Sequence, residues 1–405
     1  MIITVFTLKI FNKTPQNMNN TMQNPIPNSP SREEIIDYLQ LYRSQNVGPT
    51  TFFRLIEVFG SARSAIENFN GFFINKNPKR SIKILPRDEA EKELEEVEKF
   101  NARILLYHDH RYPQLLREIH DSPALITVKG NIEVLENKKI AIVGARNASM
   151  NALSFTRRIA VEISQNSLTT VSGMAKGIDT VAHEASILGG TIAVLGGGID
   201  NVYPAENKRL YDQISKSSLI ISEKKFNSTP KPENFVQRNR IISGLSLAVI
   251  VVEASLNSGS LTTARFAIQQ NRDLYAVPGS PFDHRCFGCN RLIKDGANMI
   301  TDIEDLYREI SDLKCKYLNL SKKFDSTKTI QLKPDKPSNH QIPSGTDINK
   351  LCDEIVKKLD NIPIEINEII SELNVSSNII NAALIQLELL DKVEINQGRV
   401  SVRID

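Results

Sequence analysis

Turns rich in glycine and other small residues recur in the middle of the sequence, each directly after a short apolar run. They are Gly144-Ala145, Ser172-Gly173, Gly196-Gly197-Gly198 and Pro278-Gly279. Glycine lets the main chain come close to a ligand, and a following helix N-terminus offers unpaired N–H groups with partial positive charge. One such turn is equally consistent with a tight strand-to-helix connection, but the set predicts an anion-binding pocket.

Hydroxyl and basic side chains accompany these turns and suit an anion that carries phosphate. Ser258, Gly259 and Ser260 precede another predicted helix. The basic residues among the glycines are Arg146, Lys176, Arg238 and Arg240. An arginine fork binds two phosphate oxygens at once, so several on one face would follow a nucleic-acid backbone with little sequence preference. For Arg240, a structural ion pair is the alternative.

Two nucleotide-binding patterns are missing from the sequence. The G-x-G-x-x-G fingerprint does not follow the first apolar run, where the chain reads Gly144-Ala145-Arg146, and the pattern G-x-x-x-x-G-K-[ST] does not occur. Both a dinucleotide-dependent enzyme and an NTPase therefore lose support.

The polar residues of this region form no recognisable catalytic set. Asp179 and His183 are four residues apart on a predicted helix, but two ligands do not complete a metal site. A helix-capping Asp179 and a hydrogen-bonded His183 are favoured instead. Glu253 either accepts a hydrogen bond from a ribose hydroxyl or caps the next turn. We predict no catalytic residues and no metal site.

The spacing of the four cysteines does not predict a metal site, a redox site or a disulfide framework. The pair Cys286-x-x-Cys289 suits zinc or redox chemistry, but two convincing further ligands are lacking, since Cys315 and Cys352 lie in or beyond the predicted linker. Few and scattered cysteines argue against a disulfide framework and fit a reducing cytoplasm.

The overall composition is typical of a globular protein and does not indicate a particular binding partner. Of 405 residues, 40% are hydrophobic and 24% are charged, and the net charge is +3. With no tryptophan and 6% aromatic residues, a nucleic-acid surface built mainly from stacking rings is not expected. The apolar runs are far shorter than the ~20 residues of a membrane helix, and no signal peptide is recognisable. We therefore expect no membrane contact and a cytoplasmic location.

Residues 138–305 supply the elements that position these side chains. Short apolar runs, rich in Val, Ile and Leu, alternate there with helical patterns. The runs are IAIVGA (140–145), LTTVSG (168–173), TIAVLGGG (191–198), SLIIS (218–222), LAVIVVEA (247–254) and DLYAVPG (273–279). They are typical of strands buried on both faces of a parallel sheet. The alternation predicts an α/β fold with a doubly wound, mostly parallel, Rossmann-like sheet, whose ligands bind at the carboxyl ends of the strands.

The rest of the chain divides around this sheet. We expect a disordered tail at residues 1–30, a helical domain at 31–101, the Rossmann-like domain at 102–310, a flexible linker at 311–347 and a winged-helix-like domain at 348–405. In the helical domain, Gly48-Pro49 separates two apolar-periodic helices. An ordinary helical hairpin is favoured there over a helix-hairpin-helix (SAM-like) unit.

Six segments, in this order, resemble the DNA-processing protein A family of bacteria (DprA, also called Smf). They are IAIVGARNAS (140–149), VSGMAKGIDTVAH (171–183), AVLGGGIDNVYP (193–204), FVQRNRIISGLS (235–246), VVEASLNSGSLTTARFA (251–267) and AVPGSPFDHRCFGCNRLIKDGA (276–297). The resemblance implies an extended Rossmann fold that binds single-stranded DNA, protects incoming DNA and helps load the RecA recombinase in natural transformation or recombination. It also implies a homodimer without catalytic activity and without a cofactor.

The resemblance places the DNA-binding residues on matching positions of this chain. They are Arg146, Lys176, Phe235, Arg238, Arg240, Ser258, Gly259 and Ser260. Phe235 would supply a base-stacking face beside the arginines.

Two departures from the family pattern qualify these expectations. The second turn reads GMAKGID, so that Met174 replaces a small residue and Lys176 replaces an arginine, which keeps the charge but loses the fork. The predicted helix at 377–390 has no Lys or Arg, whereas a helix that enters a major groove usually carries basic or amide side chains. We therefore expect the C-terminal domain to contact protein rather than to read duplex DNA.

Two other functions compete with DNA binding. Nucleotide-processing enzymes of the phosphoribohydrolase type have a similar sheet and the pattern P-G-G-x-G-T-x-x-E, but the comparable stretch at 258–264 lacks the glutamate. A protein-interaction adaptor with a vestigial pocket is the other alternative. Binding of labelled single strands distinguishes both from the DNA-binding hypothesis.

Overall fold

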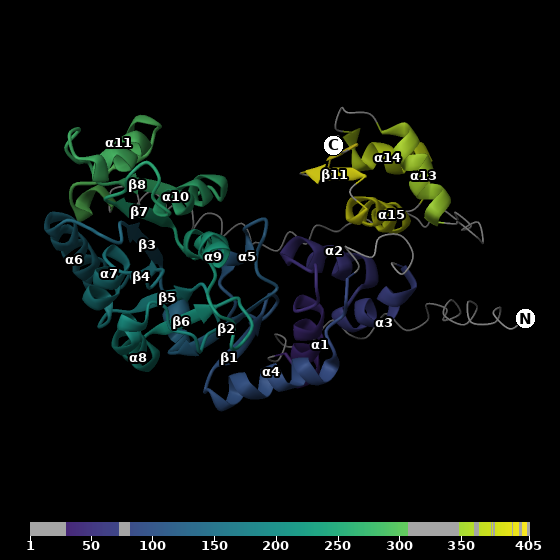
Figure 1. Cartoon of the computed structure of the whole chain (residues 1–405), viewed down its shortest axis with the longest axis horizontal. Coiled ribbons are helices and arrows are strands. Elements are labelled where there is room, and N and C mark those ends of the chain that lie inside the picture. The colour runs from purple at the N-terminus through teal and green to yellow at the C-terminus, as the bar shows by residue number, and fades with distance from the viewer. Residues whose placement is uncertain are drawn as a thin grey trace, which may run out of the picture.

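The computed structural model describes residues 30–72, 82–306, 348–359, 364–373, 375, 377–390, 392–396 and 399–402. The expected tail and linker therefore lie outside the described residues, except for residue 30. Figure 1 shows an N-terminal group of helices, a large sheet flanked by helices, and a C-terminal group of helices with a small sheet. No helix of these described parts is long and apolar enough to cross a membrane.

The described residues of the N-terminal region contain four helices. They are α1 (Arg32–Tyr42), α2 (Pro49–Phe59), α3 (Ala62–Phe72) and α4 (Arg87–Lys99). Ser31 caps α1 by accepting a hydrogen bond from the N–H of Glu34, as its place before two acidic residues predicts. Gly48 and Pro49 form the start of α2, where proline is tolerated because the first turn needs no N–H donor.

The central sheet has nine strands in the order β1-β2-β6-β5-β4-β3-β7-β8-β9. Strands β3 to β9 run parallel, and β2 and β1 are added antiparallel at the β6 edge. The strands are β1 (Arg103–Leu106), β2 (Leu125–Gly130), β3 (Lys139–Gly144), β4 (Thr169–Ser172), β5 (Thr191–Leu195), β6 (Leu219–Ser222), β7 (Ala248–Val252), β8 (Asp273–Ala276) and β9 (Asn298–Met299). The prediction of a mostly parallel sheet is confirmed.

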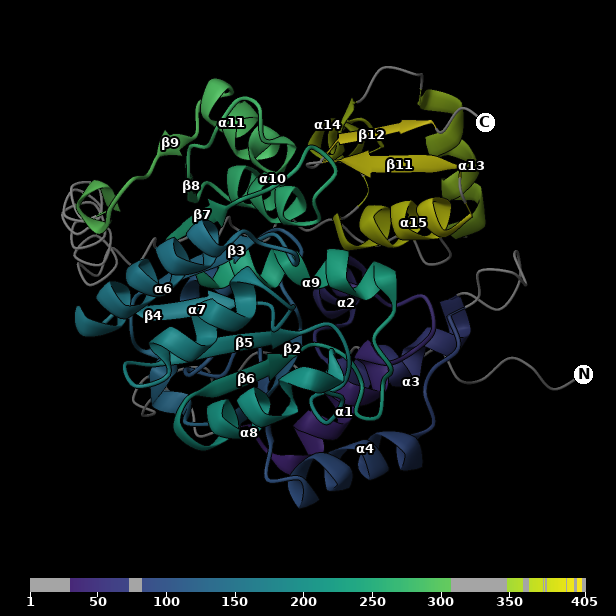
Figure 2. The ribbon, with the colours of Figure 1, turned by 60° about the vertical axis from the view of Figure 1, so that its left-hand side comes forward.

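Helices cover both faces of this sheet, because alternate side chains of each buried strand point to opposite faces. In β3, Ile140 and Ile142 pack against α6 and α7, while Ala141 and Val143 belong to the core under α9 and α10. Figure 2 shows these pairs of helices on the two sides of the strands. The helices are α5 (Gln114–Arg117), α6 (Met150–Gln165), α7 (Ile178–Ser186), α8 (Lys208–Ser217), α9 (Pro232–Leu245), α10 (Ser260–Gln269) and α11 (Phe287–Lys294). Short 3₁₀ turns lie at Ile132–Leu135, Ala205–Asn207 and His284–Cys286.

The C-terminal region has its own small core. Its helices are α13 (Ile348–Lys358), α14 (Ile366–Leu373) and α15 (Ser377–Leu389), and its strands are β10 (Ile364–Glu365), β11 (Val393–Asn396) and β12 (Arg399–Val402). The strands form an antiparallel sheet in the order β10-β12-β11. The three helices and the two final strands agree with the sequence pattern, whereas the short β10 was not predicted. Helix α15 lies against α2, where Arg54 pairs with Glu388.

Candidate nucleic-acid interface

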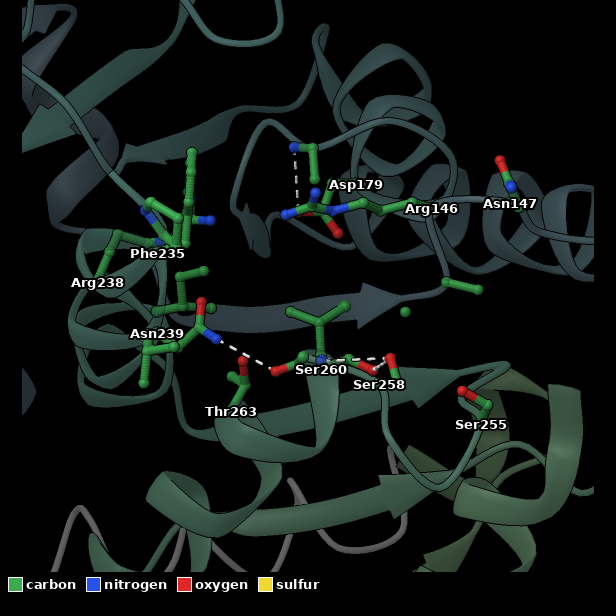
Figure 3. Close-up of a pocket in the computed structure, with 18 of the residues that line it drawn as sticks. Arg146, Asn147, Asp179, Phe235, Arg238, Asn239, Ser255, Ser258, Ser260 and Thr263 are labelled. Atoms are coloured by element: carbon green, nitrogen blue, oxygen red, sulfur yellow. Dashed lines mark hydrogen bonds between the residues drawn. The ribbon is translucent and has the colours of Figure 1, made fainter. Parts of the chain in front are cut away.

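A cavity of about 600 Å³ opens at the carboxyl edge of the parallel strands. The turn after β3 forms one wall, the first turns of α9 form a second, and the segment from β7 into α10 forms a third. Figure 3 shows Arg146 on the first wall, Phe235, Arg238 and Asn239 on the second, and Ser258 and Ser260 on the third. The cavity therefore lies where the sequence predicts ligand binding in a doubly wound sheet.

Two glycines let the first wall form. A Cβ atom on Gly144 would lie 1.9 Å from the carbonyl oxygen of Val252 in the neighbouring strand, which is far too close for any other residue. Gly177, before α7, has a φ of +78°, and a Cβ there would lie 2.4 Å from the carbonyl oxygen of Ala145. These close main-chain approaches place the start of α7 directly beside the turn after β3.

Arg146 is an exposed cation that lines the cavity. It follows Ala145 in the turn after β3, and its guanidinium carbon lies 5.8 Å from the ring centroid of Phe235 on α9. No carboxylate within the described residues forms an ion pair with it, so its hydrogen-bond donors face the cavity and solvent. Arg146 thus lines the cavity, and its contact with phosphate stays a prediction.

Arg238 lines the same cavity but is buried, with 6% of its surface exposed. Its Nη1 donates to the carbonyl oxygen of Gly173 at 2.5 Å and to that of Val194, so it joins the ends of β4 and β5. Burial lowers the pKa of Arg238 to about 10, which leaves the group charged at neutral pH. A Cβ on Gly173 would meet this guanidinium at 2.5 Å, which explains the glycine there.

Asp179 also lines the cavity, and it supports the same turn. Its carboxylate accepts hydrogen bonds from the N–H groups of Gly173 at 3.1 Å and Ala175 at 3.3 Å. Burial raises the pKa of Asp179, and the charge of Arg238 opposes this shift. Helix α7 begins after Gly177, so the prediction that Asp179 caps this helix is wrong. The Asp179 carboxylate instead stabilises the turn before the helix through these two hydrogen bonds.

Arg240, a predicted DNA contact, lies outside the cavity. Arg240 is 5% exposed and does not line the cavity. Its Nη2 lies 2.5 Å from Glu223, and its Nε lies 3.2 Å from Asp121. The structural ion pair, left open by the sequence, is the observed arrangement.

Lys176 lies beside the cavity rather than in it. The preceding Ala175 lines the cavity, but the exposed Lys176 amine pairs with Glu206 at 2.7 Å. Both side chains are more than half exposed, so this pair adds little to stability and opens readily.

The predicted hydroxyl segment forms the third wall. Ser258, Gly259 and Ser260 all line the cavity, and α10 begins at Ser260. The hydroxyls of Ser258 and Ser260 are hydrogen-bonded at 2.7 Å, and the side-chain amide of Asn239 donates to the carbonyl oxygen of Gly259 at 3.3 Å. The hydroxyls of Ser258 and Ser260 thus lie on the wall opposite Arg146, while the first N–H groups of α10 donate within the segment itself, to Ser258 and Gly259.

Several lining residues were not predicted from the sequence. They are Asn147, Tyr203, Asn239, Thr263, His284 and Arg285. Tyr203 belongs to the segment AVLGGGIDNVYP, which carries part of the family resemblance, but only its glycines were predicted to form the pocket. Asn239 is next to Arg238 on α9, and helical spacing from Phe235 was the signal that could have found it.

The remaining candidate residues have structural roles. His183 is hydrogen-bonded through Nδ1 to the hydroxyl of Thr191 at 2.7 Å, as predicted, and burial together with Arg238 lowers its pKa to about 3. Glu253 accepts hydrogen bonds from the N–H and hydroxyl of Ser149, the residue that caps α6. Burial raises the pKa of the Cys289 thiol to about 12, which makes it unreactive. No group of metal-binding side chains occurs within the described ranges.

Known proteins resemble this chain over its helical N-terminal region and its sheet. The family model of DNA recombination-mediator protein A matches residues 103–311, and the model of the DprA-like N-terminal HHH domain matches residues 32–95. The latter supports the helix-hairpin-helix interpretation, which the sequence analysis ranked below an ordinary hairpin.

Individual relatives agree with the family models. Protein Smf of Synechocystis is 32% identical over 359 residues, which is 84% of this chain and 87% of the relative. DNA processing protein DprA of Streptococcus pneumoniae is 43% identical over 216 residues, 53% of this chain and 76% of the relative. The crystal structure of DprA from the same species matches with a TM-score of 0.58 and 31% identity, covering 69% of this chain and 98% of that one. The chain belongs to the DprA/Smf family of DNA processing proteins.

Proposed function

We propose that the protein binds single-stranded DNA in the cavity at the carboxyl edge of its sheet. The observation that carries the proposal is the exposed, unpaired Arg146 facing the hydroxyls and helix start at Ser258 and Ser260 across a cavity of about 600 Å³. A cation and hydroxyl donors on opposite walls suit a phosphate backbone that enters between them. Membership of the DprA/Smf family supports the same conclusion.

The proposed contacts divide into three kinds. Arg146 and, once its surface pair opens, Lys176 bind phosphate oxygens. Ser258, Gly259 and Ser260 offer hydroxyl and main-chain donors, and Phe235 contributes an aromatic surface. Arg238 supports these groups from beneath, and Arg240 is no longer among the proposed contacts.

The family relationship also supports a biological role. We propose that the protein protects incoming single strands and helps to load the RecA recombinase, in natural transformation or recombination. It would act in the cytoplasm as a homodimer, with no catalytic step and no cofactor.

The domains proposed from the sequence remain our working division of the chain. They are the helical domain at 31–101, the Rossmann-like domain at 102–310 and the winged-helix-like domain at 348–405. The fold of three helices and a three-stranded antiparallel sheet supports the last of these. Because α15 lies against α2 and carries no Lys or Arg, we propose that the C-terminal domain contacts protein rather than duplex DNA.

A nucleotide-processing enzyme of the phosphoribohydrolase type has less support. Among the described residues that line the cavity, Asp179 is the one carboxylate, and it is occupied by two main-chain N–H groups. A carboxyl group that acts as general acid or base must reach the substrate.

Fluorescence anisotropy with labelled oligonucleotides tests the proposal. We expect tighter binding to a single strand than to a duplex of equal length, and weaker binding as the salt concentration rises, because counterions are released on binding. Equal binding to both DNAs, or no binding, would contradict the proposed function. Release of free base from a nucleotide would favour the enzyme instead.

A further inference from the structure

The aromatic ring of Phe235 is already enclosed on several sides. A Cβ on Gly196 would lie 2.8 Å from Phe235 Cδ1, so the ring packs directly on the main chain at the end of β5. The guanidinium carbons of Arg146 and Arg238 lie 5.8 and 5.9 Å from its centroid. Phe235 lines the cavity and is partly exposed, but it offers less free ring surface for stacking than a residue that is exposed.

Tyr203 presents the accessible aromatic surface of the same cavity. It lies in the segment between β5 and α8, and it is 49% exposed. Its ring centroid is 5.3 Å from that of Phe235, with 42° between the ring planes. No hydrogen bond to its hydroxyl occurs among the described residues, so the exposed ring has no evident partner other than Phe235.

We infer that Tyr203 is the residue on which a base of the bound single strand stacks, while Phe235 holds the Tyr203 ring in place. This inference rests on the proposed function and assigns its base contact. Every base has a flat π-face, so one exposed ring can bind single strands without sequence preference. A single stacking ring also agrees with the low aromatic content of the chain. Most of the affinity for single-stranded DNA would then come from phosphate contacts.

Replacing the ring tests the inference through affinity. For Tyr203→Ala we expect binding of oligothymidylate to weaken about tenfold, the loss of roughly one stacked base. An abasic oligonucleotide of equal length keeps every phosphate but has nothing to stack, so Tyr203→Ala and the unaltered protein should bind it equally. Tyr203→Phe keeps the ring and should restore most of the affinity for oligothymidylate.

A fluorescent variant provides a second measurement that does not depend on affinity. Because the sequence has no tryptophan, Tyr203→Trp introduces a single reporter into the cavity. Stacking of a base on this indole should quench its fluorescence when oligothymidylate is added, but not when the abasic oligonucleotide is added. Leu188→Trp is the matched control, since Leu188 is 99% exposed and lies between α7 and β5, at the opposite edge of the sheet.

The outcomes separate the inference from the function on which it rests. Weakened binding by Tyr203→Ala, together with quenching in Tyr203→Trp alone, supports the stacking contact. If the unaltered protein binds oligothymidylate but Tyr203→Ala binds it equally well, the inference is overturned while the proposed function stands. Failure of the unaltered protein to bind either oligonucleotide overturns both. Circular dichroism shows whether each variant is folded.

Discussion

Burial decides what each arginine of this protein does. Arg146 and Arg238 both line the cavity, and both lie within 6 Å of the Phe235 ring. Arg146 is exposed and forms no ion pair with the described residues, whereas Arg238 is buried and donates through Nη1 to the carbonyl oxygens of Gly173 and Val194. An arginine side chain therefore provides a proposed phosphate contact at position 146, but at position 238 it provides structural hydrogen bonds between the ends of β4 and β5.

His183 should make stability depend on pH. Burial and the charge of Arg238 lower its pKa in the folded protein to about 3, below the ~6.5 of an unfolded chain. Between these values the unfolded state binds one proton more, so the free energy of unfolding falls as the pH decreases from 6.5 toward 3. The slope from this one group is at most about 1.4 kcal/mol per pH unit.

Urea unfolding between pH 4.5 and 6.5 checks this expectation. The variant His183→Gln cannot take up the proton, so the free energy of unfolding should depend less steeply on pH than in the unaltered protein. Equal slopes in the two proteins would show that His183 is not kept neutral by its surroundings.

At the scale of elements, α9 connects the cavity to the N-terminal helices. One face of α9 carries Phe235 and Arg238 into the cavity, and the other carries Arg240 into a buried ion pair with Glu223. The hydroxyl of Tyr42 on α1 donates to the same Glu223 carboxylate at 2.5 Å. Arg43 also donates to the main-chain carbonyl of Glu223 at 2.9 Å. The position of α9, and with it one wall of the cavity, therefore depends on contacts with the N-terminal region.

Removal of Arg240 should destabilise the protein. Arg240→Met leaves the Glu223 carboxylate buried without its partner, a loss of about 3–5 kcal/mol in the free energy of unfolding. Adding Glu223→Gln removes the unpaired charge and should recover part of the loss. Urea unfolding followed by circular dichroism measures both variants. Unchanged stability combined with weaker DNA binding would return Arg240 to the list of DNA contacts.

The elements of the sheet differ in how far the sequence predicted them. Strands β3 to β8 coincide with the apolar runs, because a strand buried on both faces needs nearly continuous Val, Ile and Leu. The antiparallel strands β1 and β2 and the short β9 were not predicted, since they lie toward the edges of the sheet and carry weaker patterns. Ligands of a doubly wound sheet bind at the carboxyl ends of its parallel strands, so the position of the cavity was predictable from the sheet topology.

At the scale of the whole molecule, residue roles depended on contacts between distant segments. Arg240 forms ion pairs with residues that are 17 or more positions away in the sequence. Arg238 donates to main-chain carbonyl oxygens at the ends of β4 and β5, which are also far from it in the sequence. Residue type and spacing were enough to predict which charged residues and glycines lie near the cavity. They could not show which arginines are buried, nor that Tyr203 meets Phe235, because burial is decided by the packed fold.

The central claim is that phosphate contacts in the cavity hold single-stranded DNA, and Arg146 tests it most directly. Titration of unaltered protein and Arg146→Ala with oligothymidylate over a range of salt concentrations gives both affinity and its salt dependence. We expect Arg146→Ala to lose about 1.5–3 kcal/mol of binding free energy. The plot of log affinity against log salt should become shallower by about 0.7, the value for one phosphate contact on a single strand.

Arg157→Ala, at an exposed position on α6 outside the cavity, is the matched control and should change neither quantity. If Arg146→Ala instead binds single strands with the affinity and salt dependence of the unaltered protein, the cavity is not where the DNA lies.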